Sequence, residues 1–150
     1  MNRFPKPWNR EIELLYREEV SSKMEQLLDL GYGTCCLRDP QIRGIVSAAL
    51  RFFNGTRYHL DSFVIMPNHV HVLFATISPN QLPAVLHGWK GYTSSVVCRT
   101  FQIQSPFWLQ ENWDTLIRDE DQFFSFRAYI RKNPLKARLR DDEYALWGCE

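Results

Sequence analysis

The sequence lacks several features that mark large functional classes. No apolar run in its 150 residues reaches the length of a membrane-spanning helix, and the opening "MNRFPKPWNREIE" lacks the apolar stretch of a secretory signal. The four cysteines, Cys35, Cys36, Cys98 and Cys149, include no CxxC pair, so neither a zinc knuckle nor a disulfide framework is indicated. We therefore expect a soluble cytoplasmic protein with reduced thiols and no membrane partner.

An excess of charge of one sign is also lacking. The formal net charge of +1 gives no global argument for a nucleic-acid partner. There is no internal repeat, low-complexity tract or linker, and contents of 45% apolar and 14% aromatic residues are typical of a packed globule. The length then predicts a single domain over residues 1–150.

Two helices are predicted in the first third of the chain. Residues 11–30, "EIELLYREEVSSKMEQLLDL", carry apolar side chains at helical spacing and are followed by Gly31, which can end a helix. The next segment places Asp39 as the N-cap and Pro40 at the first helical position, before an apolar face and an Asn-Gly stop. Both segments predict amphipathic helices.

The rest of the chain alternates between strand and helix patterns. Residues 57–77 are rich in β-branched and aromatic side chains and are interrupted only at Pro67-Asn68, which predicts a hairpin of two strands. A third helix is expected over about 81–99, a further strand within 107–117, and a last helix over 119–133 that Pro134 ends. Together these elements predict an α+β fold with helices packed against an antiparallel sheet.

The second strand of the hairpin contains the motif "MPNHVHVLF", residues 66–74. Side chains two residues apart on a strand share a face, so His69 and His71 point one way while Val70 and Val72 point the other way. Two neutral imidazoles at this spacing suit one divalent metal ion. The alternative interpretation places both histidines on the polar face of a half-buried strand, and a metal would in any case need further ligands.

The last predicted helix offers candidates for those ligands. At about 100° per residue, Phe123, Phe126 and Ile130 form its apolar stripe, while Tyr129 and Asn133 lie together along one edge. A tyrosine hydroxyl and an amide oxygen would then face whatever the helix packs against. Taken singly, the two residues are equally typical of a core-edge aromatic and of a helix end before proline.

Positive charge is concentrated near this helix. The basic residues are Arg118, Arg127, Arg131, Lys132, Lys136, Arg138 and Arg140. Such a cluster can neutralise phosphates, and the nearby Trp108 and Trp113 can stack on unpaired bases. On charge alone, a solvated helix end balanced by the acidic residues of 119–121 and 141–143 explains the cluster equally well.

In order and spacing, these segments resemble the single-tyrosine HUH transposases of the insertion-sequence type, especially the REP-associated tyrosine transposases. The similarity extends over roughly residues 31–147 and rests on "MPNHVHVL", "LHGWKGYTSSVV", "IRDE" and "YIRKNPLKA". The resemblance implies a ferredoxin-like HUH domain that cuts and rejoins single-stranded DNA, often next to a folded hairpin.

The same resemblance implies site residues, position by position. His69 and His71 match the two histidines of the HUH motif, Tyr129 matches the nucleophile, and Asn133 matches the third protein ligand of a Mg²⁺ or Mn²⁺ ion. Tyr129 would attack a scissile phosphate and form a 5′-phosphotyrosyl link. A His/His/Asn set is softer than an all-oxygen magnesium site, so we expect Mn²⁺ to serve better in vitro.

We expect a DNA partner, single-stranded or hairpin, bound by a monomer or a homodimer. Candidate DNA contacts are Lys90, Arg118, Arg131, Lys132 and Lys136. Two other functions stay open. One is a catalytically weakened or inactive DNA-binding remnant of a transposase, and the other is an unrelated metallohydrolase, which the lack of a flanking acidic general base disfavours.

One element of the family is not apparent in the sequence. The resemblance implies an N-terminal β-strand inside the sheet, next to the HUH strand, whereas residues 1–10 contain no run that could form it. We therefore expect a sheet that lacks this strand, with residues 1–30 as a divergent or truncated helical region. A start upstream of Met1, or a decaying gene, would account for the loss.

Overall fold

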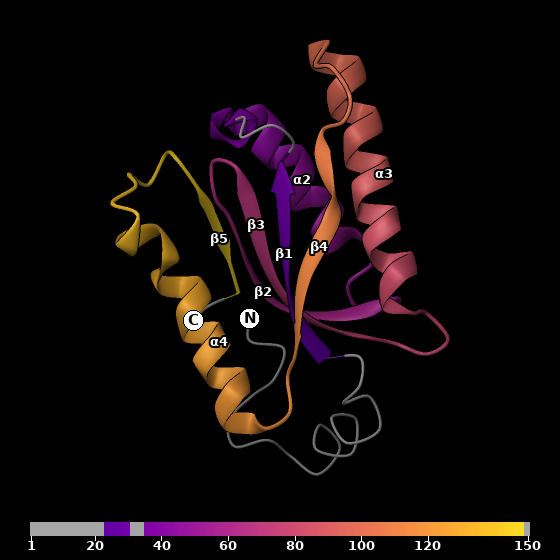
Figure 1. Ribbon diagram of the computed structural model, residues 1–150, viewed down its shortest axis with the longest axis vertical. Helices are drawn as coiled ribbons and strands as arrows, with labels where there is room; N and C mark the ends of the chain where they lie inside the picture. Colours follow the sequence, from indigo (N-terminus) through magenta and orange to yellow (C-terminus); the bar gives the residue numbers. More distant parts are fainter. Residues whose placement is uncertain (1–22, 31–34, 149–150) are drawn as a thin grey trace.

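The computed structural model describes residues 23–30 and 35–148. Its elements are β1 (Lys23–Leu30), the 3₁₀ helix η3 (Cys36–Arg38), α2 (Pro40–Phe52), β2 (Tyr58–Ile65), β3 (His69–Thr76), α3 (Leu82–Phe101), β4 (Trp108–Leu116), α4 (Glu120–Lys136) and β5 (Ala145–Trp147). Helices pack on an antiparallel sheet of order β4-β1-β3-β2-β5 (Figure 1). The predicted α+β class is confirmed, and β3, which carries the HxH motif, is the central strand.

Local sequence explains the elements that were predicted correctly. The carboxylate of Asp39 accepts a hydrogen bond from the Gln41 N–H at 2.8 Å, and Pro40 opens α2. Pro67 and Asn68 lie in the turn between β2 and β3, where the Met66 N–H donates to the His69 carbonyl at 2.8 Å. The third helix and the strand within 107–117 are also confirmed, as α3 and β4.

The N-terminal part of the sheet corrects two predictions. The helix predicted over residues 11–30 is wrong for residues 23–30, which form β1, while residues 11–22 lie outside the described part of the chain. β1 lies between β3 and β4, so the prediction of a sheet without a strand beside β3 is also wrong. Helix propensity is a weak preference, whereas this position offers backbone hydrogen bonds on both sides of the segment.

Two smaller corrections concern the C-terminal region. α4 does not end before Pro134 but continues to Lys136, and the missing N–H of the proline therefore affects only the last turn of the helix. The strand β5, which the sequence analysis did not predict, pairs antiparallel with β2. Its three residues are too few for the alternation that marks a strand.

The sheet separates two hydrophobic clusters. On one face, Val70, Val72 and Phe74 of β3 pack with residues of α2 and α3, including Trp89. On the other face, Leu73 packs with α4. Figure 1 shows α3 and α4 on opposite sides of the sheet. None of the described helices is both long and apolar enough to cross a membrane.

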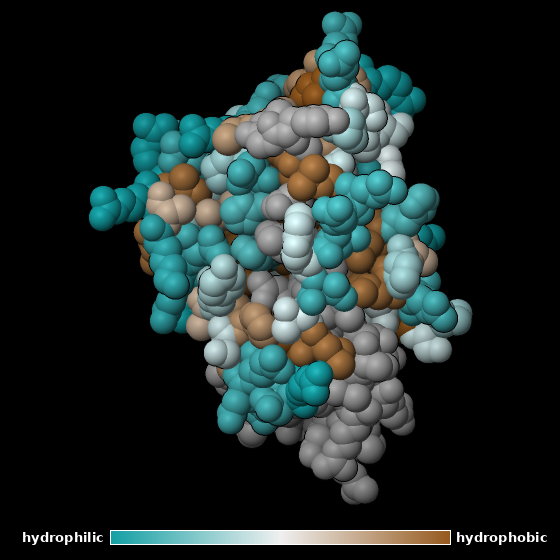
Figure 2. Space-filling view, viewed as in Figure 1, coloured by the Kyte–Doolittle hydropathy of each residue, from teal (hydrophilic) through white to brown (hydrophobic). Residues whose placement is uncertain are grey.

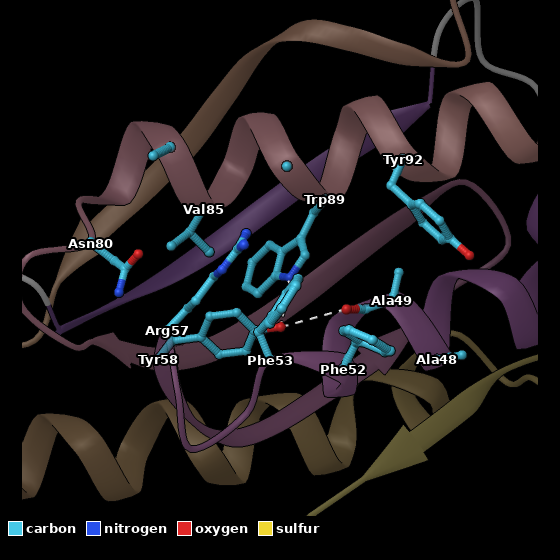
Figure 3. Close-up of a pocket in the computed structure, with 12 residues that line it drawn as sticks. Ala48, Ala49, Phe52, Phe53, Arg57, Tyr58, Asn80, Val85, Trp89 and Tyr92 are labelled. Carbon is cyan, nitrogen blue, oxygen red and sulfur yellow. Dashed lines mark hydrogen bonds between the residues drawn. The ribbon is translucent and has the colours of Figure 1, made fainter.

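A cavity of about 480 Å³ lies between α2 and α3 (Figure 3). On its wall, the indole N–H of Trp89 donates to the Tyr58 hydroxyl at 3.0 Å, and that hydroxyl donates to the Leu50 carbonyl at 2.7 Å. Burial raises the pKa of Tyr58. Phe52 and Tyr92 also line the cavity and are exposed, so its wall combines a hydrogen-bonded interior with an open aromatic surface.

Candidate functional site

The two motif histidines lie on the sheet face that α4 covers. His71 is in register with Val64 of β2, which belongs to the cluster beneath α4. The centroids of the His69 and His71 rings are 5.0 Å apart, with the ring planes at 83°. His71 is buried and His69 is partly exposed. The shared face predicted from strand alternation is therefore confirmed.

The residue before the pair orients the first imidazole. Nδ1 of His69 lies 2.8 Å from Oδ1 of Asn68. This contact holds the imidazole of His69 in place through Nδ1, one of its two ring nitrogens. Asn68 belongs to the motif itself, but the sequence analysis gave it no role at the site.

α4 brings Tyr129 to the histidines. The ring centroids of Tyr129 and His71 are 5.3 Å apart, with the planes at 82°. Phe123 and Ile130 are buried against the sheet and set the position of the helix, whereas Tyr129 is 42% exposed. A hollow of about 410 Å³, lined mainly by the first half of α4, opens beside Tyr129. The tyrosine thus contacts a buried imidazole and remains accessible to a large solute.

Asn133 and two lysines follow Tyr129 along the same side of α4. Asn133 lies one helical turn after Tyr129 and is partly exposed. Nζ of Lys136 lies 5.9 Å from the centroid of the Tyr129 ring. Lys132, three residues after Tyr129, is exposed on the same side, while Arg131 projects from the other side. Figure 2 shows a mostly hydrophilic surface along α4.

Two further expected DNA contacts occupy different places. Arg118 is exposed immediately before α4, where its backbone N–H donates to Oε1 of Gln122 at 2.7 Å. Lys90 lies on α3, at the other face of the sheet, and its ammonium donates to the carbonyls of Leu109 at 2.6 Å and Glu111 at 3.3 Å. The structure therefore does not bring Lys90 together with the histidines and Tyr129, and its contacts tie α3 to β4.

The two tryptophans near the basic cluster differ. Trp108 is buried, and its indole N–H donates to Oγ1 of Thr93 at 2.8 Å, so the expectation that it stacks on bases is wrong. Trp113 is 47% exposed. It is in register with Leu27 of β1, which is in register with His71. Residues opposite one another in antiparallel strands share a face, so Trp113 lies on the face that carries the histidines.

One cation of the expected basic cluster is not on the surface. Arg127 is buried and forms an ion pair with Asp61 of β2, in which Nε donates to Oδ2 at 3.1 Å and Nη2 donates to Oδ1. Asp61 was not among the residues predicted for the site. A single acidic residue within the apolar strand "YHLDSFVI" was the available signal, because a buried carboxylate requires a partner.

The donor set fits a divalent cation. Among the residues that the structure describes, no group of three His, Cys, Asp or Glu side chains could hold a metal ion. A metal here would rest on His69, His71 and a ligand of another type. The amide oxygen of Asn133 is of a suitable type. The contact of His69 Nδ1 with Asn68 agrees with such a role, because a second partner commonly orients an imidazole that binds a metal.

Sequence comparison gives a family and a relative. The family described as IS200-like transposases matches residues 41–133, more than half of the chain. A protein of Haemophilus influenzae is 30% identical over 105 residues, which cover 56% of this chain and 57% of that protein. The chain thus spans little more than half the length of this curated relative.

Solved structures show the same fold. The structure of a REP-associated tyrosine transposase bound to a REP hairpin matches with a TM-score of 0.63 at 15% identity, covering 77% of this chain and 68% of that chain. A candidate transposase from Deinococcus radiodurans matches with a TM-score of 0.55 at 18% identity, covering 73% and 88%. The segment matched by the family contains both motif histidines, Tyr129 and Asn133, and the chain belongs to the IS200-like transposase family.

Proposed function

We propose that the protein is a metal-dependent endonuclease and strand transferase for single-stranded DNA, acting near DNA hairpins with Tyr129 as the nucleophile. The observation that carries this proposal is the contact between Tyr129 of α4 and His71 of β3, which with His69 forms a pair on one face of the sheet. A purely structural tyrosine would gain little from being 42% exposed beside a buried imidazole. A nucleophile needs both access and a fixed position.

His69, His71 and Asn133 would hold the cation, Mg²⁺ or Mn²⁺. When bound, such an ion polarises a phosphate and stabilises the charge that develops on its oxygens. Asn68 orients the His69 ring through its contact with Nδ1. The packing of α4 on the sheet brings Tyr129 against His71, and Asn133 lies one helical turn after Tyr129.

The proposed reaction is a transesterification. The phenolic oxygen of Tyr129 forms a bond to the scissile phosphorus, and the bond from phosphorus to the 3′ oxygen of the preceding nucleotide breaks. The phenolic proton passes to solvent, and the leaving 3′ oxygen takes up a proton. The 5′-phosphotyrosyl link keeps the energy of the broken ester, so a 3′-hydroxyl can later attack it and rejoin strands.

DNA would be bound along α4 and the adjoining sheet face. Lys132 and Lys136 follow Tyr129 on the same side of α4, Arg131 is exposed on the other side of the helix, and Arg118 is exposed just before it. Trp113 offers an exposed ring on the face of the histidines for stacking on an unpaired base. We rank Lys90 below these residues, because its ammonium already donates to two backbone carbonyls.

The similar transposase structure was determined bound to a REP hairpin, which supports hairpin DNA as the partner here. We place this activity in the cytoplasm, with the protein acting as a monomer or a homodimer. The described part of the chain contains the strand β1, which the sequence analysis expected to be lost. That removes the main reason for regarding the protein as a decayed remnant.

The test is covalent capture of DNA. The protein is incubated with a 3′-labelled single-stranded oligonucleotide containing a hairpin, with Mn²⁺ or with EDTA, and separated under denaturing conditions. We expect a labelled adduct with Mn²⁺ that is lost in Tyr129→Phe. Tyr92→Phe is the matched control, since Tyr92 is an exposed tyrosine on α3. An adduct that survives in Tyr129→Phe, or binding without any adduct in the unmodified protein, would overturn the proposal.

A further inference from the structure

The α4 face of the sheet holds a buried ion pair that the proposed chemistry does not use. Asp61 is fully buried on β2, and the Arg127 side chain of α4 is only 7% exposed. Desolvating two charges is costly, and an apolar pair of similar volume often stabilises a fold as well or better. The surrounding cluster consists of apolar residues such as Val64, Leu73 and Ile130. A gain in folding stability therefore does not explain well why an ion pair is buried in this cluster.

The local backbone is shaped to present this carboxylate. Leu60 is in register with Phe74 and Ser62 with Leu73, so β2 advances by two residues while β3 advances by one. Asp61 is the extra residue of a β-bulge. A bulge breaks strict alternation and can redirect a side chain. Asp61 reaches Arg127 of α4, and the neighbouring Ser62 donates from Oγ to Oδ2 of Asp61 at 2.9 Å.

The C-terminal strand covers the back of the bulge. Gly148, directly after β5, has φ of +82°, and a Cβ placed on it would lie 2.2 Å from the carbonyl oxygen of Asp61. Only glycine permits both this backbone conformation and this approach. The bulge is thus enclosed by chain on one side and by the guanidinium of Arg127 on the other.

The ion pair acts on the helix that carries Tyr129. Arg127 uses two nitrogens against both oxygens of Asp61, and its Cζ lies 5.2 Å from the Phe123 ring centroid and 5.4 Å from that of Phe124. Apolar packing tolerates small shifts and rotations of a helix, whereas a bidentate pair fixes both distance and orientation. Tyr129 follows two residues after Arg127 on the same helix, and its ring lies against His71.

We propose that Asp61 and Arg127 are positioning residues that hold α4 in the register and rotation required for Tyr129 to lie against His71. Ser62 and the bulge orient the carboxylate for this task. The catalytic consequence rests on the proposed function. The structural consequence, the contact between Tyr129 and His71, does not, and it can be measured without metal or DNA.

The test compares variants that keep or lose the directional pair. In the double variant Asp61→Leu/Arg127→Met both charges are replaced together, which leaves no buried charge unpaired and should preserve folding. We expect a melting temperature close to that of the unmodified protein, loss of the NMR cross-relaxation between the His71 and Tyr129 rings, and adduct formation slower by about a hundredfold. Asp142→Asn is the matched control, because the Arg140–Asp142 pair is exposed.

A second variant covers the case in which the double variant fails to fold. Arg127→Lys keeps the buried positive charge but cannot form a bidentate pair, so we expect a folded protein with a weakened ring contact and an intermediate adduct rate. A folded variant that retains both the ring contact and the adduct rate within twofold would overturn the inference. If the unmodified protein forms no adduct, the proposed function fails, while the ring contact still decides the role of the ion pair.

Discussion

The two faces of the sheet differ in how they treat polar groups. On the α2/α3 face, the core is apolar and aromatic, and Thr93 and the Tyr58 hydroxyl form neutral hydrogen bonds. The buried Arg43 of α2 donates to backbone carbonyls rather than to a carboxylate. On the α4 face, the sheet buries His71, Asp61 and Ser62, and α4 buries Arg127. Both faces belong to the same strands, so the contrast arises from the side chains and from the β-bulge at Asp61.

The difference indicates that the two faces of the sheet have different roles. Neutral, internally satisfied groups cost little to bury and serve packing. Ionised or ionisable groups are costly to bury unless they are paired, and proteins concentrate them where chemistry or fixed geometry requires them. The α2/α3 face therefore supports the fold, while the α4 face holds the residues of the proposed reaction. Substitutions on either face test whether stability and DNA chemistry are separated in this way.

The largest contrast is expected on β3 itself, whose neighbouring residues point to opposite faces. Phe74→Ala should destabilise the protein by about 3–5 kcal/mol, because it opens a cavity in the α2/α3 core. His71→Gln keeps a polar side chain of similar size and should leave the protein folded but unable to form the DNA adduct. Chemical denaturation and the adduct assay measure the two effects. Equal loss of stability in both variants would contradict the division between faces.

The two tryptophans of β4 provide a second comparison. Trp108→Ala should lower the free energy of unfolding by about 3–5 kcal/mol, because Trp108 is buried and bonded to Thr93. Trp113→Ala should weaken binding of single-stranded DNA by about 1–3 kcal/mol, the loss of one stacked base. Fluorescence anisotropy and thermal melting separate these outcomes. Unchanged DNA affinity in Trp113→Ala would remove Trp113 from the proposed DNA surface.

Surface cations offer a third, smaller contrast. Replacing Lys132 or Lys136 by Gln should reduce the slope of log affinity against log salt by about 0.7 per lost phosphate contact on a single strand. Arg99→Gln on α3 is the matched control, because Arg99 is exposed on the other face. Titrations at several salt concentrations give the slopes. A control that changes the slope as much as the lysine variants would show that DNA does not favour the α4 face.

The smallest expected effect is a gain of stability on the α2/α3 face. Gly88 lies in the middle of α3, and a Cβ built there meets no atom within 4 Å. Gly88→Ala should therefore raise the free energy of unfolding by about 0.5–1 kcal/mol through helix propensity, without changing adduct formation. Denaturant unfolding checks the first part. A loss of stability would show that the cavity wall needs the glycine.

Much of the fold and part of the site could be predicted from local sequence. Asp39 and Pro40 encode the start of α2, and strand alternation places His69 and His71 on one face of β3. Helix geometry offered Tyr129 as a candidate partner of these histidines, the resemblance implied its role as nucleophile, and the structure supplies the contact. The strand character of Lys23–Leu30 could not be predicted, because it depends on two neighbouring strands rather than on the segment's own helix-favouring residues.

Caps, turns and periodicity are enough to predict the central hairpin, the helices that pack on it and the side on which the histidines lie. The tertiary structure was needed to show that Arg127 is a buried partner of Asp61 rather than a surface cation. It also decided that Trp108 is buried while Trp113 stays exposed. Charge and aromatic character belong to the residue itself. Burial and pairing depend on the side chains that distant segments place next to the residue, and these cannot be read from the local sequence.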